Sequence, residues 1–208
     1  VKGMDLEILN LKAIPIGCQR NAYFLNKKEL NALKKTKYNE PQRVDGFYLS
    51  KTIALLENKT LASLKKFIVE RAEEYTRDVL EIKDKIYLTQ SWSTINTTNA
   101  SHKTHRNPNT FISVVYYAQC KEGTIRFHLY TNSLRECFNF HYTINKFNIY
   151  NSPNWALSVK TGDIVLFPGH IYHSSAVHKS PEPRIIVGAN FFLKGSLGLK
   201  KHVSLITL

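Results

Sequence analysis

The sequence is poor in cysteine and in long hydrophobic runs. Its only cysteines are Cys18, Cys120 and Cys137, an odd number at irregular spacing. This spacing excludes a disulfide framework and a zinc knuckle, and it is typical of a reducing compartment. No run of about 18 apolar residues occurs, so no membrane-spanning helix and no membrane partner are expected. Because the N-terminus also lacks a signal-peptide pattern, we expect a cytoplasmic protein, in the host cytoplasm if its source is viral.

Acidic residues are few compared with basic ones. The chain has 16 Asp and Glu against 29 Lys and Arg, which gives a formal net charge of +13. Such an excess favours encounters with polyanions, but the basic residues are spread along the whole chain and no nucleic-acid-binding motif accompanies them. A solubilising surface explains the charge, and nucleic acid is kept as an alternative partner on charge alone.

The chain shows no repeat and no linker, so we expect a single domain over residues 1–208. Helical patterns are confined to residues 1–84. Asn26-Lys-Lys-Glu29 predicts a capping box that opens a short helix ending near Lys35. A second helix is predicted over residues 60–82, with Thr60 as its cap, because apolar residues recur there every three or four positions.

Residues 85–208 alternate between apolar and polar side chains, with turn residues at short intervals, which predicts strands rather than helices. The predicted strands are Ile86–Thr94, Phe111–Gln119, Thr124–Tyr130, Phe138–Asn148, Trp155–Val159, Asp163–Phe167 and Arg184–Leu193. Strands without intervening helices favour a sandwich or a jelly roll rather than a parallel sheet, and of these we expect the jelly roll, the cupin-like double-stranded β-helix. We therefore expect a mainly β fold with N-terminal helices on one outer face and a ligand-binding mouth.

Histidine placement gives the clearest indication of chemistry. His105 lies just before the Phe111 strand, and His173 follows the strand that ends at Pro168. In a jelly roll these two segments can lie side by side, with Arg184 opening the next strand. Imidazole binds Fe(II) well, and a buried arginine can hold a dicarboxylate by paired hydrogen bonds. Of the other histidines, His102 is an alternative ligand, His128 is predicted to be a hydrogen-bonded wall residue and His170 an exposed loop residue.

Residues 91–192 carry a series of short motifs in a fixed order. They are Ser91-Trp92, His105-Arg-Asn-Pro-Asn-Thr110, Ser113-Val-Val-Tyr-Tyr117, Phe167-Pro-Gly-His-Ile-Tyr-His173, Arg184-Ile-Ile and Asn190-Phe191. In order and spacing they resemble the Fe(II)/2-oxoglutarate-dependent oxygenase superfamily. Within it, they resemble most the putative 2OG-Fe(II) oxygenase family of marine bacteria and phages.

The resemblance implies an Fe(II)-dependent dioxygenase that consumes 2-oxoglutarate and O₂ and hydroxylates an unknown prime substrate. It implies His105 and His173 as iron ligands, with Asn107 at the position of the third ligand. Arg184 is implied as the residue that binds the far carboxylate of 2-oxoglutarate, and Tyr117 as a second candidate for this contact. No catalytic residue is implied beyond the metal ligands.

The motifs also depart from the family pattern. The superfamily has a carboxylate, and this family a histidine, where the chain has Asn107, which offers iron only a neutral oxygen. Ile186 replaces a serine two residues after Arg184, and Val114 replaces a glycine. Two alternatives therefore stay open: a catalytically degenerate jelly-roll binding module with a basic surface, and a cupin-like metalloprotein that does not use 2-oxoglutarate. A halogenase is disfavoured because Asn107 is larger than the Gly or Ala expected at that position.

Overall fold

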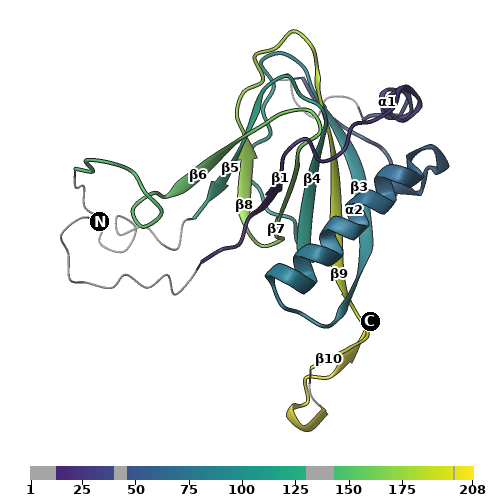
Figure 1. The fold of residues 1–208 in the computed structure, drawn as a ribbon, viewed down its shortest axis with the longest axis vertical. Coiled ribbons are helices and arrows are strands. Elements are labelled where there is room, and N and C mark those ends of the chain that lie inside the picture. The colour runs from purple at the N-terminus through teal and green to yellow at the C-terminus, as the bar shows by residue number, and fades with distance from the viewer. Residues whose placement is uncertain (1–12, 40–45, 130–142, 199) are drawn as a thin grey trace.

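A six-stranded antiparallel sheet forms the larger wall of the fold (Figure 1). The computed structural model describes residues 13–39, 46–129, 143–198 and 200–208. In spatial order the strands are β1 (Gly17–Gln19), β7 (Ile164–Pro168), β4 (Ile112–Gln119), β9 (Arg184–Lys194), β3 (Lys85–Asn96) and β2 (Phe47–Leu49). The two N-terminal strands, β1 and β2, lie at opposite edges of this sheet.

A smaller sheet faces the larger one. It contains β6 (Asn154–Val159), β5 (Gly123–His128) and β8 (Tyr172–Ser175), in that order. Buried residues of both sheets form one cluster between them, including Val115 and Phe167 from the larger sheet and Ile125 and Phe127 from the smaller one. We call the side of the larger sheet that faces this cluster its inner face. Two antiparallel sheets packed in this way confirm the predicted jelly roll.

The remaining elements lie outside the two sheets. Helix α1 (Lys27–Lys34) begins at the predicted capping box, in which Asn26 Oδ1 accepts from Glu29 N and a Glu29 carboxylate oxygen accepts from Asn26 N, each at 3.0 Å. A hairpin of β10 (Ser196–Leu197) and β11 (Ile206–Thr207) encloses a 3₁₀ turn at Lys200–His202. No helix among the described residues is long and apolar enough to span a membrane.

The second helix begins later than its sequence pattern predicts. Two 3₁₀ turns, Leu55–Glu57 and Lys59–Leu61, precede α2 (Ala62–Glu74), and a π-helical turn over Tyr75–Val79 follows it. The predicted cap at Thr60 is wrong, because Asn58 Oδ1 accepts a hydrogen bond from Thr60 N at 2.9 Å and thus caps the second turn. The apolar periodicity was a sound guide to the buried face but not to where the α-helix begins.

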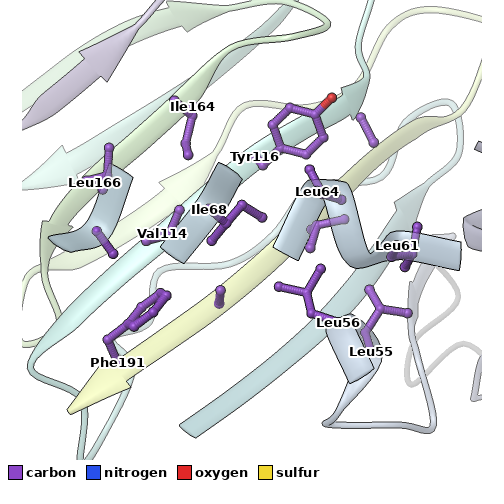
Figure 2. Close-up of a cluster of buried hydrophobic side chains, with 14 of the residues drawn as sticks. Leu55, Leu56, Leu61, Leu64, Ile68, Val114, Tyr116, Ile164, Leu166 and Phe191 are labelled. Atoms are coloured by element: carbon purple, nitrogen blue, oxygen red, sulfur yellow. The ribbon is translucent and has the colours of Figure 1, made fainter. Parts of the chain in front are cut away.

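Helix α2 covers the outer face of the larger sheet (Figure 2). Leu64 and Ile68 of the helix are fully buried in one cluster with Val114, Tyr116 and Phe191 of the sheet. These side chains recur every second residue along their strands, as expected for one face of a sheet. The apolar core on this side fixes the sheet against the helix and leaves the inner face available for other groups.

Most predicted strands appear within two residues of their expected ends. The exception is the strand predicted over 138–148: residues 138–142 lie outside the described part of the chain, and 143–148 form no strand. Five short strands were not predicted: β1, β2, β8, β10 and β11. Strand β8 matters most, because it contains His173, which lies outside every predicted strand.

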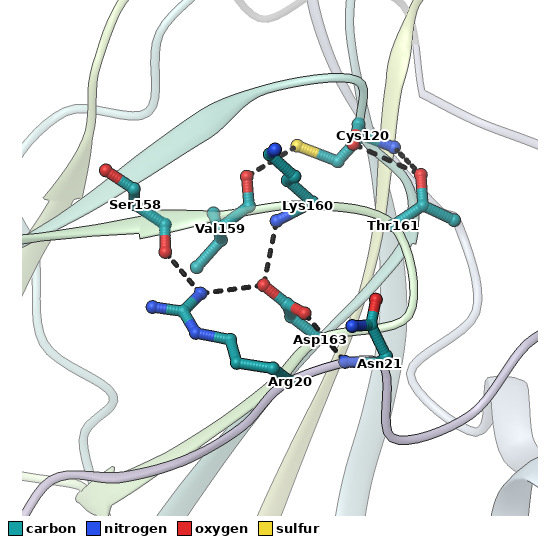
Figure 3. Close-up of polar contacts among 8 residues, drawn as sticks. All are labelled: Arg20, Asn21, Cys120, Ser158, Val159, Lys160, Thr161 and Asp163. Carbon is teal, nitrogen blue, oxygen red and sulfur yellow. Dashed lines mark hydrogen bonds and ion pairs between the residues drawn. The ribbon is translucent and has the colours of Figure 1, made fainter.

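A polar cluster ties the segment after β1 to the turn before β7 (Figure 3). Asp163 Oδ2 accepts hydrogen bonds from Arg20 Nη1 at 2.7 Å and Lys160 N at 2.9 Å, and its Oδ1 accepts from Asn21 N at 3.0 Å. Burial by itself would raise the pKa of Asp163, but these donors outweigh it and hold that pKa below its usual value. This buried carboxylate is therefore fully paired.

Candidate metal and cosubstrate site

His105 and His173 lie directly opposite each other at one end of the space between the sheets. His105 N donates to His173 O at 3.0 Å, and His173 N donates to His105 O at 2.8 Å, which makes an isolated antiparallel bridge. The centroids of the two imidazole rings are 4.2 Å apart. The structure thus brings together the two histidines that the sequence pattern paired, although most of the jelly roll separates them along the chain.

Backbone carbonyls orient both imidazoles. His105 Nδ1 lies 2.8 Å from Lys103 O, and His173 Nδ1 lies 3.0 Å from Ile171 O. A carbonyl oxygen only accepts hydrogen bonds, so in each ring Nδ1 carries the hydrogen and Nε2 keeps its lone pair. This is the arrangement by which proteins prepare histidine to ligate a metal through Nε2.

Burial keeps the two rings neutral. Desolvation, assisted by the nearby His105, lowers the pKa of His173 to about 4. Desolvation also lowers the pKa of His105. Because only the neutral imidazole has a free lone pair, both rings are in the metal-binding form at neutral pH.

Asn107 is held by its amide nitrogen. Its Nδ2 donates to Ser113 Oγ at 2.9 Å and to Asn190 Oδ1 at 3.2 Å, and these residues belong to β4 and β9. With Nδ2 occupied on the sheet side, Oδ1 is the polar atom that Asn107 has left for the cavity that it lines. The described residues contain no group of three or more His, Cys, Asp or Glu side chains able to hold a metal. The candidate site therefore consists of two imidazoles and a neutral amide.

Within the described part of the chain, Arg184 is a buried cation without a carboxylate partner. Its side chain lies at the start of β9, and the residue is 3% exposed. Its guanidinium donates from Nη2 to Ser175 Oγ at 2.8 Å, and none of the ion pairs among the described residues involves it. Burial lowers the pKa of Arg184, as expected for a charge taken out of water. A buried guanidinium of this kind is stabilised when an anion enters beside it.

All five residues predicted from the sequence line one cavity between the sheets: His105, Asn107, Tyr117, His173 and Arg184. Tyr117 comes from β4 and is buried, and burial raises the pKa of its phenol. Apolar side chains of Val115, Ile125 and Ile186 form much of the remaining wall. The described lining of the cavity contains no acidic side chain, so Arg184 is the charged group within it.

His128 and His170 lie where the sequence predicts them, and His102 lies beside the candidate ligands. His102 also lines the cavity and stacks between Phe47, at 4.5 Å, and His105, at 3.8 Å, between ring centroids. His128 Nε2 lies 2.9 Å from Ser174 Oγ on the smaller sheet, so it is a hydrogen-bonded wall residue. His170 is exposed.

Sequence reasoning missed Ser175. Its hydroxyl oxygen accepts from both Arg184 Nη2 and His102 N, each at 2.8 Å, and so links the buried cation to the histidine segment. The only signal was its position two residues after His173, which places both side chains on the same face once β8 is known to be a strand.

Comparisons with known proteins find a related family and related folds. Residues 90–190 match the model of a family described as "Putative 2OG-Fe(II) oxygenase". The matched segment contains both histidines, Asn107 and Arg184, and it agrees with the segment whose motifs resembled that family. A search of curated protein sequences found no match.

Solved structures of 2OG-Fe(II) oxygenases share the fold. The epimerase SnoN from nogalamycin biosynthesis has a TM-score of 0.61 and 13% identity, over 86% of this chain and 78% of that chain. HygX from Streptomyces hygroscopicus, solved with nickel, 2-oxoglutarate and hygromycin B, has a TM-score of 0.58 and 11% identity, over 86% and 82%. A Pseudomonas putida prolyl-4-hydroxylase has a TM-score of 0.51 and 13% identity, over 88% and 94%. Over residues 90–190, just under half of its length, the chain is similar to the 2OG-Fe(II) oxygenase family.

Proposed function

We propose that this protein is an Fe(II)- and 2-oxoglutarate-dependent oxygenase that hydroxylates its prime substrate. One observation carries the proposal: two neutral imidazoles with available Nε2 atoms share a cavity with a buried guanidinium that has no carboxylate partner among the described residues. The first pair suits a divalent transition metal, and the guanidinium suits the carboxylate of a cosubstrate. The similarity of residues 90–190 to the 2OG-Fe(II) oxygenase family supports the same assignment.

The residues present fit Fe(II). His105 and His173 would bind it through Nε2, and Asn107 would supply Oδ1 as a neutral third ligand. Imidazole suits iron, whereas an amide oxygen brings no negative charge, so we expect weaker iron binding than in relatives with a carboxylate at this position. The backbone carbonyls of Lys103 and Ile171 hold the two rings in the required tautomer.

The residues also fit 2-oxoglutarate. Arg184 would bind its distal carboxylate with the guanidinium, and the Tyr117 hydroxyl would donate to the same group. The buried, protonated phenol is a donor at all physiological pH values because burial raises its pKa. When bound, Fe(II) and 2-oxoglutarate would supply O₂ activation coupled to decarboxylation of the cosubstrate to succinate. The apolar walls of Val115, Ile125 and Ile186 would keep water away from these groups.

Hydroxylation is the proposed outcome, and the prime substrate is unknown. The fold relatives include a prolyl hydroxylase, the epimerase SnoN and the carbocyclase SnoK, so the same fold supports several outcomes. The outcome depends on which substrate C–H bond lies nearest the iron, and that is determined by the mouth of the cavity rather than by the fold.

The proposal is tested by anaerobic titration of the protein with Fe(II) and 2-oxoglutarate. We expect a visible charge-transfer band in the wild type and in His170→Ala, which removes an exposed histidine outside the cavity lining. His173→Ala should give no band, because it removes one of the two imidazole ligands. Failure of the folded wild type to bind iron, combined with salt-sensitive retention of nucleic acid, would favour the alternative of a degenerate binding module.

A further inference from the structure

The inner face of β3 carries two buried polar atoms without partners. Thr94 Oγ1 and Asn96 Nδ2 have no hydrogen-bond partner among the described residues. Thr94 is fully buried and Asn96 is 1% exposed. On the opposite face of the same strand, Ser91 Oγ accepts from Leu56 N at 2.9 Å and Ser93 Oγ donates to Ile186 O at 2.9 Å, so the polar groups there are satisfied.

Only one of the two unpartnered atoms faces the candidate site. Asn96 lines the cavity that holds the histidines and Arg184, whereas Thr94 is not part of its lining. An amide nitrogen buried without an acceptor costs free energy that folding alone does not recover. Buried unsatisfied groups are rare in folded proteins, and one that lines a cavity indicates that something else supplies the acceptor.

The sheet register places this amide beside the buried cation. Asn96 on β3 is the direct antiparallel partner of Arg184 on β9. Directly opposed residues project from the same face of a sheet with their Cβ atoms about 5 Å apart. Asn96 Nδ2 and the guanidinium nitrogens are all donors, so the two groups cannot satisfy each other. Together they require an acceptor that enters from the cavity.

We propose that Asn96 is a further cosubstrate-binding residue, whose Nδ2 donates to the distal carboxylate of 2-oxoglutarate beside Arg184. This inference rests on the proposed function and adds a contact that the family motifs do not assign. It also offsets a loss noted in the sequence: Ile186 stands where the family has a serine hydroxyl, and Asn96 places a donor on the neighbouring strand, opposite Arg184. A carboxylate has enough acceptor positions for the guanidinium and the amide at once.

Asn96→Leu tests the contact, because leucine has nearly the same shape and no donor. Binding would be measured by anaerobic calorimetry with Fe(II), using 2-oxoglutarate and 2-oxopentanoate, which has a methyl group in place of the distal carboxylate. We expect 2-oxoglutarate affinity to fall about 10-fold or more, as for a lost hydrogen bond to a charged group. Affinities for 2-oxopentanoate and for Fe(II) alone should stay as in the wild type.

Thr94→Val is the matched control, because it removes the neighbouring unpartnered atom that does not line the cavity. It should leave the affinities for both 2-oxo acids unchanged. Without cosubstrate, Asn96→Leu should unfold at the wild-type temperature or above, since it removes an unsatisfied donor. A purely structural role for Asn96 predicts instead that Asn96→Leu lowers the unfolding temperature. It also predicts that the affinities for 2-oxoglutarate and 2-oxopentanoate fall equally.

A second variant covers the case in which leucine disturbs the strand. Asn96→Asp keeps the shape and places a negative charge beside Arg184, so it should weaken 2-oxoglutarate binding more than leucine does. Two results would overturn this inference and leave the proposed function intact. One is a wild-type preference for 2-oxoglutarate over 2-oxopentanoate in either Asn96 variant. The other is a loss of 2-oxoglutarate affinity in Thr94→Val equal to that in Asn96→Leu. A folded wild type that binds neither 2-oxo acid would overturn the proposed function and this inference with it.

Discussion

The two faces of the larger sheet differ in how well their side chains are satisfied. Strand β9 shows this directly, because its residues alternate between the faces. Those toward helix α2 are apolar and at most 1% exposed: Ile185, Val187, Ala189 and Phe191. Those on the inner face are Arg184, Ile186, Gly188 and Asn190, and they include a glycine and a buried cation with no counter-charge in the part of the chain that the structure describes. The outer face is packed for stability, and the inner face keeps unsatisfied donors and open space.

Gly188 illustrates the second kind of site. A Cβ at this position would lie 2.4 Å from the Trp92 ring, so only glycine allows the indole to lie across the inner face. Trp92 lines the cavity there, two residues before Thr94 on the same face of β3. The cavity on the inner face lowers the free energy of unfolding, because side chains there are less closely packed. The apolar packing of the outer face offsets this loss. The comparison predicts opposite stability effects for substitutions on the two faces.

Phe191→Ala should give the largest effect. Phe191 is fully buried in the outer cluster, and removing a buried phenyl group leaves a cavity, so the free energy of unfolding should fall by about 3–5 kcal/mol. Chemical denaturation would measure it. The matched control is Phe147→Ala, because Phe147 is 59% exposed and its loss should change stability by less than about 0.5 kcal/mol. A small effect of Phe191→Ala would remove the basis for calling the outer face the stabilising one.

Unlike Phe191→Ala, Arg184→Met should not lower the free energy of unfolding, but it should strongly weaken cosubstrate binding. Methionine keeps the length and removes a buried charge that has no carboxylate partner within the described ranges, so the unliganded protein should be at least as stable as the wild type. Affinity for 2-oxoglutarate should fall about 100-fold, as for a lost buried charge pair. Thermal unfolding and calorimetry on the same samples would check both. A clear loss of unliganded stability would show that Arg184 is paired within the protein.

Asp163→Asn sharpens the contrast between satisfied and unsatisfied polar groups. Asp163 is buried and paired with Arg20, Asn21 and Lys160, so losing its charge should lower the free energy of unfolding by about 2 kcal/mol at neutral pH. Its folded pKa lies below the ordinary 3.8, so this contribution is fully present above that value and is lost as pH falls through the lowered pKa. Stability measured against pH should therefore show the wild type and Asp163→Asn converging in acid. A difference that does not depend on pH would contradict the ionic origin.

Much of the fold follows from local patterns, and the errors have local causes. The long strands β3, β4 and β9 alternate over many residues, so their positions were predictable. Strands β1, β2 and β8 have only three or four residues, too few for a period of two to be recognised. For the second helix, the apolar stripe continued through two 3₁₀ turns, and the sequence offered no way to distinguish them from an α-helical first turn.

The candidate site divides in the same way. His105, His173 and Arg184 were predictable because their residue types and motif order are specific to one chemistry, and the structure places all three in one cavity. Their roles as ligands stay a prediction. Asn96 was not predictable, because its proposed role depends on its register with Arg184 and on its amide nitrogen having no partner among the described residues. Both properties exist only after distant strands pair.

Asn107→Asp should have the smallest effect of the four, yet it tests the inner face most directly. A carboxylate here would give the site the negative charge that its described lining lacks, and charge is the largest local contribution in a metal site. We expect Fe(II) to bind about 10-fold more tightly, as for changes that alter ligand basicity at a metal centre. Turnover of 2-oxoglutarate to succinate should persist or rise.

The new carboxylate must also fit its surroundings, and this limits the gain. Asn107 now donates to Asn190 Oδ1, so an aspartate would require the Asn190 amide to turn and present its nitrogen. Fe(II) affinity and succinate release would be measured in the wild type, in Asn107→Asp, and in both backgrounds with His173→Ala. Because His173 supplies one of two imidazoles, its loss should abolish iron binding in either background. Equal and negligible iron binding in the wild type and Asn107→Asp would remove the metal site and leave only the fold.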